Sequence, residues 1–287
     1  MSDASPGGSI HQGQVNEPTL LTVEGISVRF AGVKALTDIS FHVQPGELFA
    51  VIGPNGAGKT SLFNVLSRVY QPVSGKVTFD GRDLLQLKTY QVARVGIART
   101  FQNLGQFPNT TVLDYLLLGR HTRMRSGILL GGLYVGMASK EEKKNRAYCL
   151  HLLELLELAR WRDFPLRSLP YGLQKRADIA RALALEPKLL LLDEPVAGMN
   201  SDETEDIAAV ILDIKEQLGV TQILVEHDMA LVMGIADRVL VLDFGRIIAQ
   251  GIPAEVQSNP DVIKAYLGEE FSIRTTDDMS ITADNSR

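Results

Sequence analysis

Hydrophobic positions near the start of the chain follow the pattern of short strands around a loop. From residue 20 the runs LLTVEGISVRF and ISFHVQ precede a Pro45–Gly46 turn and the apolar run LFAVI. Runs of this kind, bounded by turn residues, predict β-strands. After a glycine-rich loop, SLFNVLSRVY places Leu62, Val65, Leu66 and Val69 at helical spacing. The loop is therefore expected to join a buried strand to a helix, and KVTFDG predicts one further strand.

The middle of the chain has a helical pattern instead. The segment VLDYLLLGR is followed by EEKKNRAYCLHLLELLELARW, in which Leu150, Leu153, Leu156 and Leu158 form an apolar face. After this insert, helices and strands alternate: LQKRADIARALAL, KLLLLDEP, DETEDIAAVILDIKEQL, TQILVEHD, MALVMGIA and the hairpin RVLVLDFGRIIAQG. Continuous apolar strands of this kind are typical of a parallel sheet buried on both faces. The pattern predicts an α/β fold with an inserted helical subdomain.

These patterns also suggest domain boundaries. The polar ends, residues 1–19 and 269–287, are expected to be flexible tails. Residues 20–268 then form one unit, in which residues 20–103 and 184–268 make the core that contains the glycine-rich loop. Residues 104–183 make the helical subdomain.

Composition argues against several classes of protein. The 287 residues are 45% hydrophobic, with a net charge of −5 and a pI near 5.6, whereas nucleic-acid binding usually requires a basic surface. One cysteine, Cys149, cannot form an internal disulfide or a cysteine-rich metal site. The N-terminus lacks the pattern of a secretory signal, and the longest nearly apolar run, residues 128–138, is shorter than the roughly 20 residues of a membrane span. A cytosolic protein is expected, with any membrane contact made through partners.

The glycine-rich loop matches G-x-x-x-x-G-K-[ST], placed between a strand and a helix as that motif requires. Glycines let the backbone turn sharply, so that successive N–H groups point at phosphate oxygens beside a helix N-terminus. The lysine would reach the β and γ phosphates, and the threonine hydroxyl would be a magnesium ligand. The expected ATP-binding residues are Gly53, Pro54, Asn55, Gly56, Ala57, Gly58, Lys59, Thr60 and Ser61.

A second motif is an acid pair at the end of the apolar strand LLLLDE. Ligands of α/β sheets bind at the carboxyl ends of strands. Asp193 is therefore expected to hold magnesium, and Glu194 to polarise the water that attacks the γ phosphate. Alone, the pair would also fit a solvated strand end before Pro195. Together with the phosphate-binding loop, it predicts an ATPase of the P-loop NTPase class.

The order of these motifs resembles the ABC ATPase family between about Leu20 and Gly268. The resemblance implies a RecA-like mixed sheet with an antiparallel β subdomain. It also implies that Phe30 stacks on adenine, that Gln102 contacts Mg²⁺ and couples the site to a membrane subunit, and that His227 contacts the γ phosphate. Taken alone, Phe30 would also fit a core phenylalanine and His227 a structural histidine, and a single glutamine carries little information.

The family's signature loop, Leu-Ser-Gly-Gly-Gln, aligns with Leu169–Leu173 and differs from it at three of five positions. In the family this loop closes over ATP held by a second subunit, and its serine contacts the γ phosphate. Pro170 cannot supply that contact. Tyr171 and Gly172 remain as nucleotide contacts, next to an expected helix N-terminus at residues 173–176. Likewise, Asn200 replaces an aspartate that the family usually has.

These departures resemble the ATPases of branched-chain amino acid importers, in particular the larger, LivG-like subunit. The segments that carry the resemblance are LPYGLQKR, AGMN, RTFQN and IIAQGIPAEV. It implies ATP and Mg²⁺ as cofactors and two transmembrane permease subunits as partners, at the cytoplasmic face of the membrane. It further implies a second ABC ATPase, expected to be a different chain, that completes an ATP sandwich, and an indirectly associated solute-binding protein.

Several alternatives stay open. Related importers of urea, amides or aromatic acids use similar ATPases. A soluble ABC ATPase that acts on nucleic acid is disfavoured by the single P-loop and the acidic charge, and an unrelated P-loop kinase by the order of the motifs. The basic residues Arg120, His121, Arg123 and Arg125, beside the glycine-rich run, fit either a solvated loop or a contact with a membrane subunit or lipid headgroups.

Overall fold

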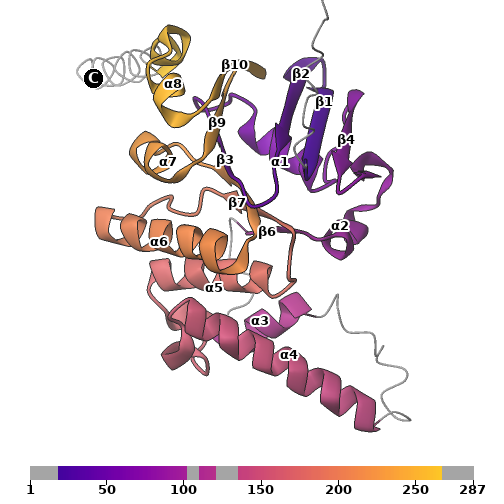
Figure 1. The fold of residues 1–287 in the computed structure, drawn as a ribbon, viewed down its shortest axis with the longest axis vertical. Helices are drawn as coiled ribbons and strands as arrows, with labels where there is room; N and C mark the ends of the chain where they lie inside the picture. The colour runs from indigo at the N-terminus through magenta and orange to yellow at the C-terminus, as the bar shows by residue number, and fades with distance from the viewer. Residues whose placement is uncertain (1–18, 102–109, 121–134, 267–287) are drawn as a thin grey trace, which may run out of the picture.

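Residues 19–101, 110–120 and 135–266 are described by the computed structural model, which consists of two sheets and a helical region (Figure 1). The smaller sheet is antiparallel, with the strand order β2-β1-β4-β5. Its strands are β1 (Leu21–Phe30), β2 (Val33–Val43), β4 (Ser74–Phe79) and β5 (Arg82–Asp83). Inward positions of β1 and β2 are buried and alternate with exposed ones, as expected for a sheet with one solvated face.

The larger sheet has the strand order β10-β9-β3-β8-β7-β6. Five of its strands are parallel, and β10 pairs antiparallel at one edge. Its strands are β3 (Leu48–Ile52), β6 (Ile97–Arg99), β7 (Leu189–Asp193), β8 (Thr221–Val225), β9 (Arg238–Asp243) and β10 (Arg246–Gly251). The three central strands β3, β8 and β7 are buried at every position, which confirms the expected parallel sheet covered on both faces.

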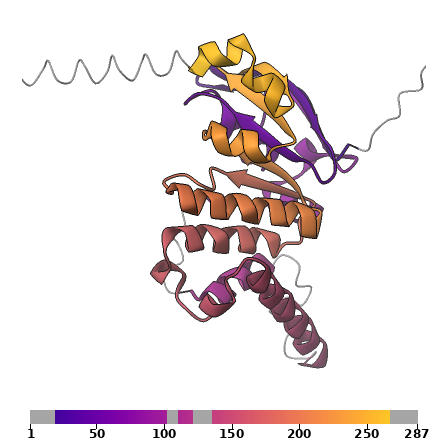
Figure 2. The same ribbon diagram turned by 60° about the vertical axis from the view of Figure 1, so that its left-hand side comes forward.

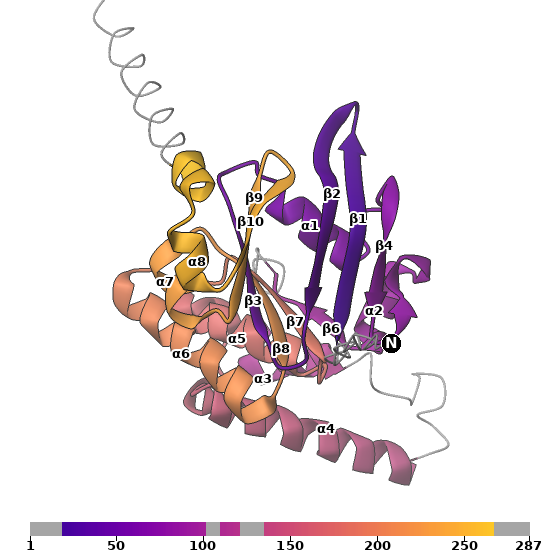
Figure 3. The same cartoon turned by 45° about the horizontal axis from the view of Figure 1, so that its top comes forward.

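Helices cover the two faces of the larger sheet unequally. Figure 3 shows α1 between the two sheets, whereas α5 and α6 lie against the opposite face and α3 and α4 lie farthest from the antiparallel sheet (Figures 1 and 2). The α-helices are α1 (Lys59–Leu66), α2 (Thr89–Val95), α3 (Val112–Arg120), α4 (Val135–Leu155), α5 (Tyr171–Leu183), α6 (Ser201–Leu218), α7 (Met229–Ile235) and α8 (Pro253–Gln257). Short 3₁₀ turns cover Leu84–Gln86, Ala159–Trp161 and Leu166–Ser168. None of the helices in the described ranges is long and apolar enough to cross a membrane.

The alternation of side chains along β3 divides the core into two clusters. Leu48, Ala50 and Ile52 belong to the cluster that includes the helical region, while Phe49 and Val51 belong to the cluster that contains α1 and the antiparallel sheet. Successive side chains of a strand point to opposite faces, so one short strand contributes to both clusters. This places the loop after β3 at the junction of the two halves of the core.

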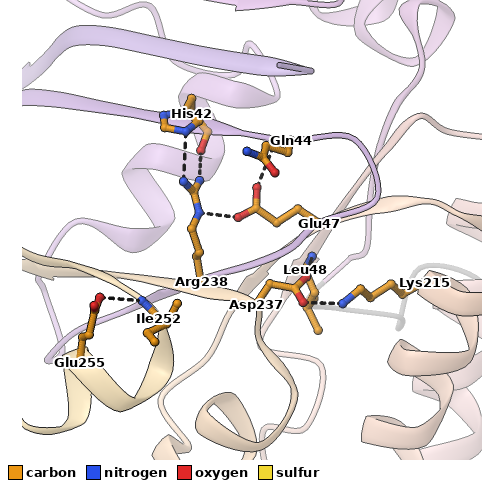
Figure 4. Close-up of polar contacts among 9 residues, drawn as sticks. All are labelled: His42, Gln44, Glu47, Leu48, Lys215, Asp237, Arg238, Ile252 and Glu255. Carbon is orange, nitrogen blue, oxygen red and sulfur yellow. Dashed lines mark hydrogen bonds and ion pairs between the residues drawn. The ribbon is translucent and has the colours of Figure 1, made fainter. Parts of the chain in front are cut away.

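A polar network joins the start of β9 to the end of β2, where the two sheets approach each other (Figure 4). The Arg238 Nε donates to Glu47 Oε1 at 2.6 Å, and its Nη2 donates to the carbonyl of His42. The other oxygen of Glu47 accepts the backbone N–H of Gln44 at 2.7 Å. The neighbouring Asp237 accepts the N–H at the start of β3 at 2.7 Å. These contacts fix the antiparallel sheet against the larger one.

Two helix ends differ from the sequence-based expectation. The helix α1 ends at Leu66, so Val69 lies beyond it and is 56% exposed instead of packing on the apolar face. Arg68 has a φ of 58°, which a continuing helix does not allow. Similarly, α4 ends at Leu155, and Glu157 has a φ of 57°. The leucines after α4 are still buried, because the chain turns back onto the same core.

Arg120 corrects the interpretation of the basic segment. Its side chain is 4% exposed, not solvated or facing a membrane. It donates to Asn145 at 3.0 and 2.7 Å and to the carbonyl of Ala184 at 3.0 Å, and it pairs with Glu186. The guanidinium thus ties α3 to α4 and to the end of α5. The other three basic residues of that segment lie outside the described residues.

Candidate nucleotide-binding site

The phosphate-binding loop connects β3 to α1 as the motif predicts. Its glycines have positive φ angles: 147° at Gly53, 79° at Gly56 and 108° at Gly58. A Cβ at Gly53 would lie 2.0 Å from the carbonyl oxygen of Leu242, and one at Gly58 would lie 2.8 Å from that of Ala35. Glycine is therefore required here for the close approach of other backbone as well as for the turn.

Lys59 opens α1 and is 6% exposed. Its Nζ donates to the carbonyl of Gly53 and, at 3.0 Å, to that of Pro54, which places the ammonium across the loop. Phosphate oxygens are stronger acceptors than these carbonyls. The adjacent Thr60 is exposed and Ser61 is half-buried, at the first turn of the helix.

The acid pair ends β7, beside β8 and close to β3 in the same parallel sheet. Asp193 is 1% exposed. Glu194 is half-buried and has a φ of 47°, a left-handed conformation that costs a non-glycine residue about 1–3 kcal/mol. Its backbone N–H donates to the carbonyl of Val225 at 2.9 Å. The chain therefore turns at Glu194, and this second acid is less buried than Asp193.

Arg99, at the end of β6, contacts Asp193 and was not assigned a role from the sequence. Its Nη2 lies 2.6 Å from Asp193 Oδ2, while Nη1 donates to Asn64 Oδ1 at 2.8 Å and to Ser67 Oγ at 2.9 Å. The backbone N–H of Asp193 donates to Thr100 Oγ1 at 3.1 Å. In the sequence, Arg99 is marked only by its position shortly before Gln102. Its contact with Asp193 depends on β6 lying next to β7, which the sequence does not state.

His227 follows β8, the strand between β3 and β7, and its side chain is 60% exposed. The residue before it, Glu226, is completely buried. Glu226 Oε1 accepts the N–H of Val196 at 3.0 Å, and Oε2 accepts the N–H of His227 at 3.1 Å. The carboxylate of Glu226 therefore connects the segment after the acid pair with the histidine. An acid at the end of the otherwise apolar run QILV was the sequence signal for this buried group.

Burial raises the pKa of the Glu226 carboxyl. The backbone N–H groups of Val196 and His227 and the charge of His227 act in the opposite direction, and the nearby charge of Glu194 raises the pKa further. Removing a carboxylate from water disfavours its charged form, and here that effect exceeds the stabilisation by two N–H donors. The site thus holds one acid that is harder to ionise than usual.

The signature segment begins α5, with Pro170 at the N-cap position. The helix starts at Tyr171, two residues before the expected N-terminus, and the tyrosine side chain is 45% exposed. Gly172 is half-buried and lies next to Glu203 of α6. Asn200 caps α6 by accepting the N–H of Glu203 at 3.0 Å, so it has a structural role in this chain.

Farther along α5, Asp178 is 1% exposed and joins the helix to the end of β6. It accepts the N–H of Phe101, the hydroxyl of Tyr115 at 2.8 Å and the Nε of Arg181 at 2.8 Å. Arg181 in turn donates to the carbonyl of Arg99 at 2.9 Å. Burial, followed by the charge of Asp178, raises the pKa of Tyr115, which keeps its hydroxyl a donor. The signature helix is thereby connected to the strand that contacts Asp193.

Two predicted site residues remain, of which the structure describes Phe30 but not Gln102. Phe30 ends β1, is 42% exposed and makes an edge-on contact with Tyr70, with ring centroids 4.8 Å apart. Gln102 lies outside the described residues. The structure thus brings together the loop after β3, the acids after β7 and the histidine after β8 at the carboxyl ends of three adjacent strands. Phe30 belongs to the antiparallel sheet.

Family models and related proteins that match this chain are those of ABC transporters. A family model described as ABC transporter matches residues 36–197, and one described as branched-chain amino acid ATP-binding cassette transporter matches residues 246–272. The chain is 39% identical to the high-affinity branched-chain amino acid transport ATP-binding protein BraF of Pseudomonas aeruginosa. It is 38% identical to the corresponding protein LivG of Escherichia coli. Each alignment covers 87% of this chain and 98% of the relative.

Solved structures agree with this assignment. The ADP conformation of an ATP-binding cassette of an ABC transporter has a TM-score of 0.77 at 32% identity, covering 88% of this chain and 99% of that one. A nucleotide-free ATP-binding cassette has a TM-score of 0.76 at 31% identity, covering 86% and 98%. The sequence-based expectation of an α/β P-loop fold of this type is confirmed. The chain therefore belongs to the ABC transporter family of ATP-binding, ATP-hydrolysing subunits.

Proposed function

We propose that this chain is the ATPase subunit of an importer that takes up branched-chain amino acids. The observation that carries the proposal is the convergence of three motifs at one edge of the larger sheet: the phosphate-binding loop, the acid pair and His227. The proposed solute follows from the similarity to BraF and LivG, which are named as branched-chain amino acid transport proteins.

In this proposal the triphosphate lies against residues Gly53–Ser61, with Lys59 transferring its donors from the loop carbonyls to phosphate oxygens. The open face of Phe30 stacks on adenine. Tyr171 and Gly172, at the start of α5, contact the nucleotide of a second ATPase subunit. Because Pro170 lacks a hydroxyl, that contact is expected to rely on backbone N–H groups of the helix N-terminus.

A magnesium ion fits the same site. Asp193 Oδ1 is buried without a hydrogen-bond partner among the residues that the structure describes, as an oxygen reserved for a cation would be. Oxygen donors of this kind, with the exposed hydroxyl of Thr60, match the preference of Mg²⁺. Gln102 is proposed as a third ligand. The ion would neutralise charge on the β and γ phosphates.

Hydrolysis is proposed to depend on Glu194 and His227. Glu194 orients and polarises the water that attacks the γ phosphate, and its fixed left-handed backbone limits where its carboxylate can reach. His227 donates a hydrogen bond to the charge that develops on the transferred phosphoryl group. Lys59 stabilises the same charge.

The proposed partners are a second ABC ATPase, which is expected to be a different chain, and two transmembrane permease subunits, with a solute-binding protein acting indirectly. A groove of about 450 Å³ lies between the end of α1, α2, β6 and α5, and it includes the exposed side chains of Val69 and Phe101. We assign this groove to a cytoplasmic segment of a permease. The chain would then be peripheral at the cytoplasmic face of the membrane, and nucleic acid is not a proposed partner.

Replacing Glu194 with glutamine tests the catalytic assignment. The amide keeps the shape of the side chain but is a poor base, so we expect the ATPase rate to fall by roughly 10²- to 10⁴-fold while ATP still binds. ATP-dependent association with the partner ATPase should become longer-lived, as measured by size-exclusion chromatography. Glu205→Gln, on the exposed face of α6, is the matched control and should leave the rate unchanged. An undiminished rate in Glu194→Gln would disprove the assignment.

The solute is tested separately, because an ATPase subunit does not touch it. The complex copurified with this chain would be reconstituted with its binding protein, and uptake of radiolabelled leucine, urea, acetamide and phenylalanine compared. ATP-dependent leucine uptake that Glu194→Gln abolishes would support the proposal. Uptake of another solute alone would leave the importer assignment in place and overturn the substrate. Salt-sensitive binding of nucleic acid instead of permease subunits would overturn both.

A further inference from the structure

The two carboxylate oxygens of Asp193 have different surroundings. Oδ2 lies 2.6 Å from Nη2 of Arg99, while Oδ1 is buried without a hydrogen-bond partner among the described residues. The Asp193 side chain is completely buried and that of Arg99 is 21% exposed. A carboxylate held through one oxygen keeps a single orientation, and here that orientation leaves the other oxygen free to act as a ligand.

Arg99 is itself fixed from the opposite side. Its Nη1 donates to Asn64 Oδ1 at 2.8 Å and to Ser67 Oγ at 2.9 Å, and its guanidinium lies 5.6 Å from the ring centroid of Phe63. Asn64 and Phe63 belong to α1, and Ser67 caps its end. The same helix carries Thr60, the other proposed magnesium ligand among the described residues. Arg99 thus links Asp193 at the end of β7 to the helix that carries its co-ligand.

We propose that Arg99 is a positioning residue for the magnesium ion: the fork of its guanidinium holds Asp193 Oδ2 and α1 together, so that Oδ1 of Asp193 points to the metal. The inference rests on the proposed function, because it assumes that Asp193 binds magnesium. Groups that hold a metal-binding side chain through its second atom commonly account for 10- to 100-fold in metal affinity. Lysine has no such fork, and its single ammonium cannot reproduce contacts in two directions.

A competing interpretation is that Arg99 is a substitute cation, which occupies the site until magnesium displaces it. The contacts on Nη1 argue against this, because displacement would also break the bonds to Asn64 and Ser67. The two interpretations predict opposite effects of removing Arg99 on the affinity for the metal. Removing a positioning residue weakens metal binding, whereas removing a competing cation strengthens it.

The test is metal binding without turnover. Mn²⁺, which is paramagnetic, would be titrated into the protein with a non-hydrolysable ATP analogue and followed by electron paramagnetic resonance. For Arg99→Met we expect a dissociation constant for Mn²⁺ raised roughly 10- to 100-fold. The affinity for the analogue in EDTA should stay within about twofold of wild type, which reports that the nucleotide site is intact. An unchanged or tighter Mn²⁺ affinity would overturn the proposal.

Further variants distinguish an error in the role of Arg99 from an error in the magnesium assignment. Asn64→Ala combined with Ser67→Ala keeps Arg99 but removes its anchor on α1, and an intermediate loss of Mn²⁺ affinity is expected. This variant also serves if Arg99→Met does not fold, and a wild-type affinity in it would contradict the proposal. Arg99→Lys should bind Mn²⁺ more weakly than wild type. If Asp193→Asn left Mn²⁺ binding unchanged, the magnesium assignment itself would be wrong, whereas loss in Asp193→Asn without loss in Arg99→Met would refute only the role of Arg99.

Steady-state kinetics give an independent readout. Because the proposed defect is in metal binding, the Mg²⁺ concentration needed for half-maximal ATPase activity should rise in Arg99→Met by about the same factor as the Mn²⁺ dissociation constant. The rate at saturating Mg²⁺ should recover most of the wild-type value. A lower maximal rate with an unchanged Mg²⁺ dependence would instead indicate a role in the chemical step and contradict the proposal.

Discussion

Glu226 is a carboxylic acid placed where water does not reach it. Its two oxygens accept the backbone N–H groups of Val196 and His227, so it holds the segment after the acid pair against the histidine that follows β8. Its burial is complete, and this raises its pKa. A group of this kind makes the stability of the folded state depend on pH.

Glu226 contributes more stability at low pH than at high pH. The folded-state pKa of Glu226 is raised above the unfolded value of about 4.3, so the neutral acid favours folding. Its contribution is fully present below the unfolded value and is lost as pH rises through the folded-state pKa. We expect the urea midpoint of the wild type, relative to Glu226→Gln, to be highest near pH 4 and to fall as the pH is raised to 8. Parallel midpoints across this range would contradict the pKa direction.

At the site, the sequence pointed to residues that lie within one linear motif. The phosphate-binding loop and the acid pair are each continuous in the sequence, and the structure places the loop between β3 and α1 and the acids at the end of β7. Arg99 and Glu226 were not predicted. Arg99 pairs with a residue 94 positions away, across strands whose adjacency the sequence does not state. The partners of Glu226 are backbone N–H groups, which leave no trace in side-chain patterns.

Among elements, the loop between β3 and α1 differs in steric limits from one glycine to the next. A Cβ at Gly58 would lie 2.8 Å both from the carbonyl oxygen of Ala35 and from a methyl of Leu36, in a backbone with a φ of 108°. At Gly56 the φ is 79°, but nothing lies within 4 Å of the added atom. The two glycines therefore separate the cost of a positive φ from the cost of a clash.

Alanine at each position tests this difference. Both variants should be destabilised by the positive φ, and Gly58→Ala by about 1–3 kcal/mol more, because β2 would have to move away from the loop. Urea unfolding of the two variants gives the comparison. Equal midpoints would show that β2 relaxes without cost. Since α1 carries Lys59, we also expect Gly58→Ala to bind ATP more weakly than Gly56→Ala, as measured by fluorescence of a labelled nucleotide.

Element types were predictable to a greater extent than element ends. The continuous apolar runs of β3, β7 and β8 indicated buried parallel strands, and α5, α6 and α7 followed their periodicity closely. The end of α1 was missed, because Val69 continues the apolar spacing although Arg68 adopts a positive φ. Arg120 was misinterpreted for a related reason. Its charge suggested the surface, whereas acceptors on α4 and at the end of α5 surround it in the interior.

At the scale of the whole molecule, the proposed site requires two sheets to keep a fixed relation. Phe30 belongs to the antiparallel sheet, while the phosphate-binding loop leaves the larger one. The turn between β9 and β10 spans both: the N–H of Gly245 donates to the carbonyl of Ala57 at 2.9 Å, and its carbonyl accepts the N–H of Thr37 at 2.7 Å. The alternation of elements predicted the parallel sheet, and the family resemblance implied the antiparallel one. The sequence pattern could not predict these hydrogen bonds, which join segments about 190–210 residues apart.

The network around Arg238 provides a test of how the sheets are held together (Figure 4). Its ion pair with Glu47 is largely buried, with side-chain exposures of 22% and 6%. Arg238→Met would leave the buried Glu47 carboxylate without this cation, while it still accepts the N–H of Gln44, and breaking such a pair typically lowers the free energy of unfolding by about 3–5 kcal/mol. We expect the free energy of unfolding to fall by an amount near the lower end of that range, because Arg238 is partly solvated.

The neighbouring pair of Lys215 and Asp237 supplies the matched control. Its side chains are 26% and 41% exposed, so Lys215→Met should cost no more than about 1 kcal/mol. Urea unfolding would measure both variants. Adding Glu47→Gln to Arg238→Met should restore part of the stability, because the uncompensated charge is then removed. If Arg238→Met and Lys215→Met had equal midpoints, the Arg238–Glu47 pair would not be what holds the antiparallel sheet in place, and apolar contacts such as the stacked rings of Phe41 and Phe49 would have to suffice.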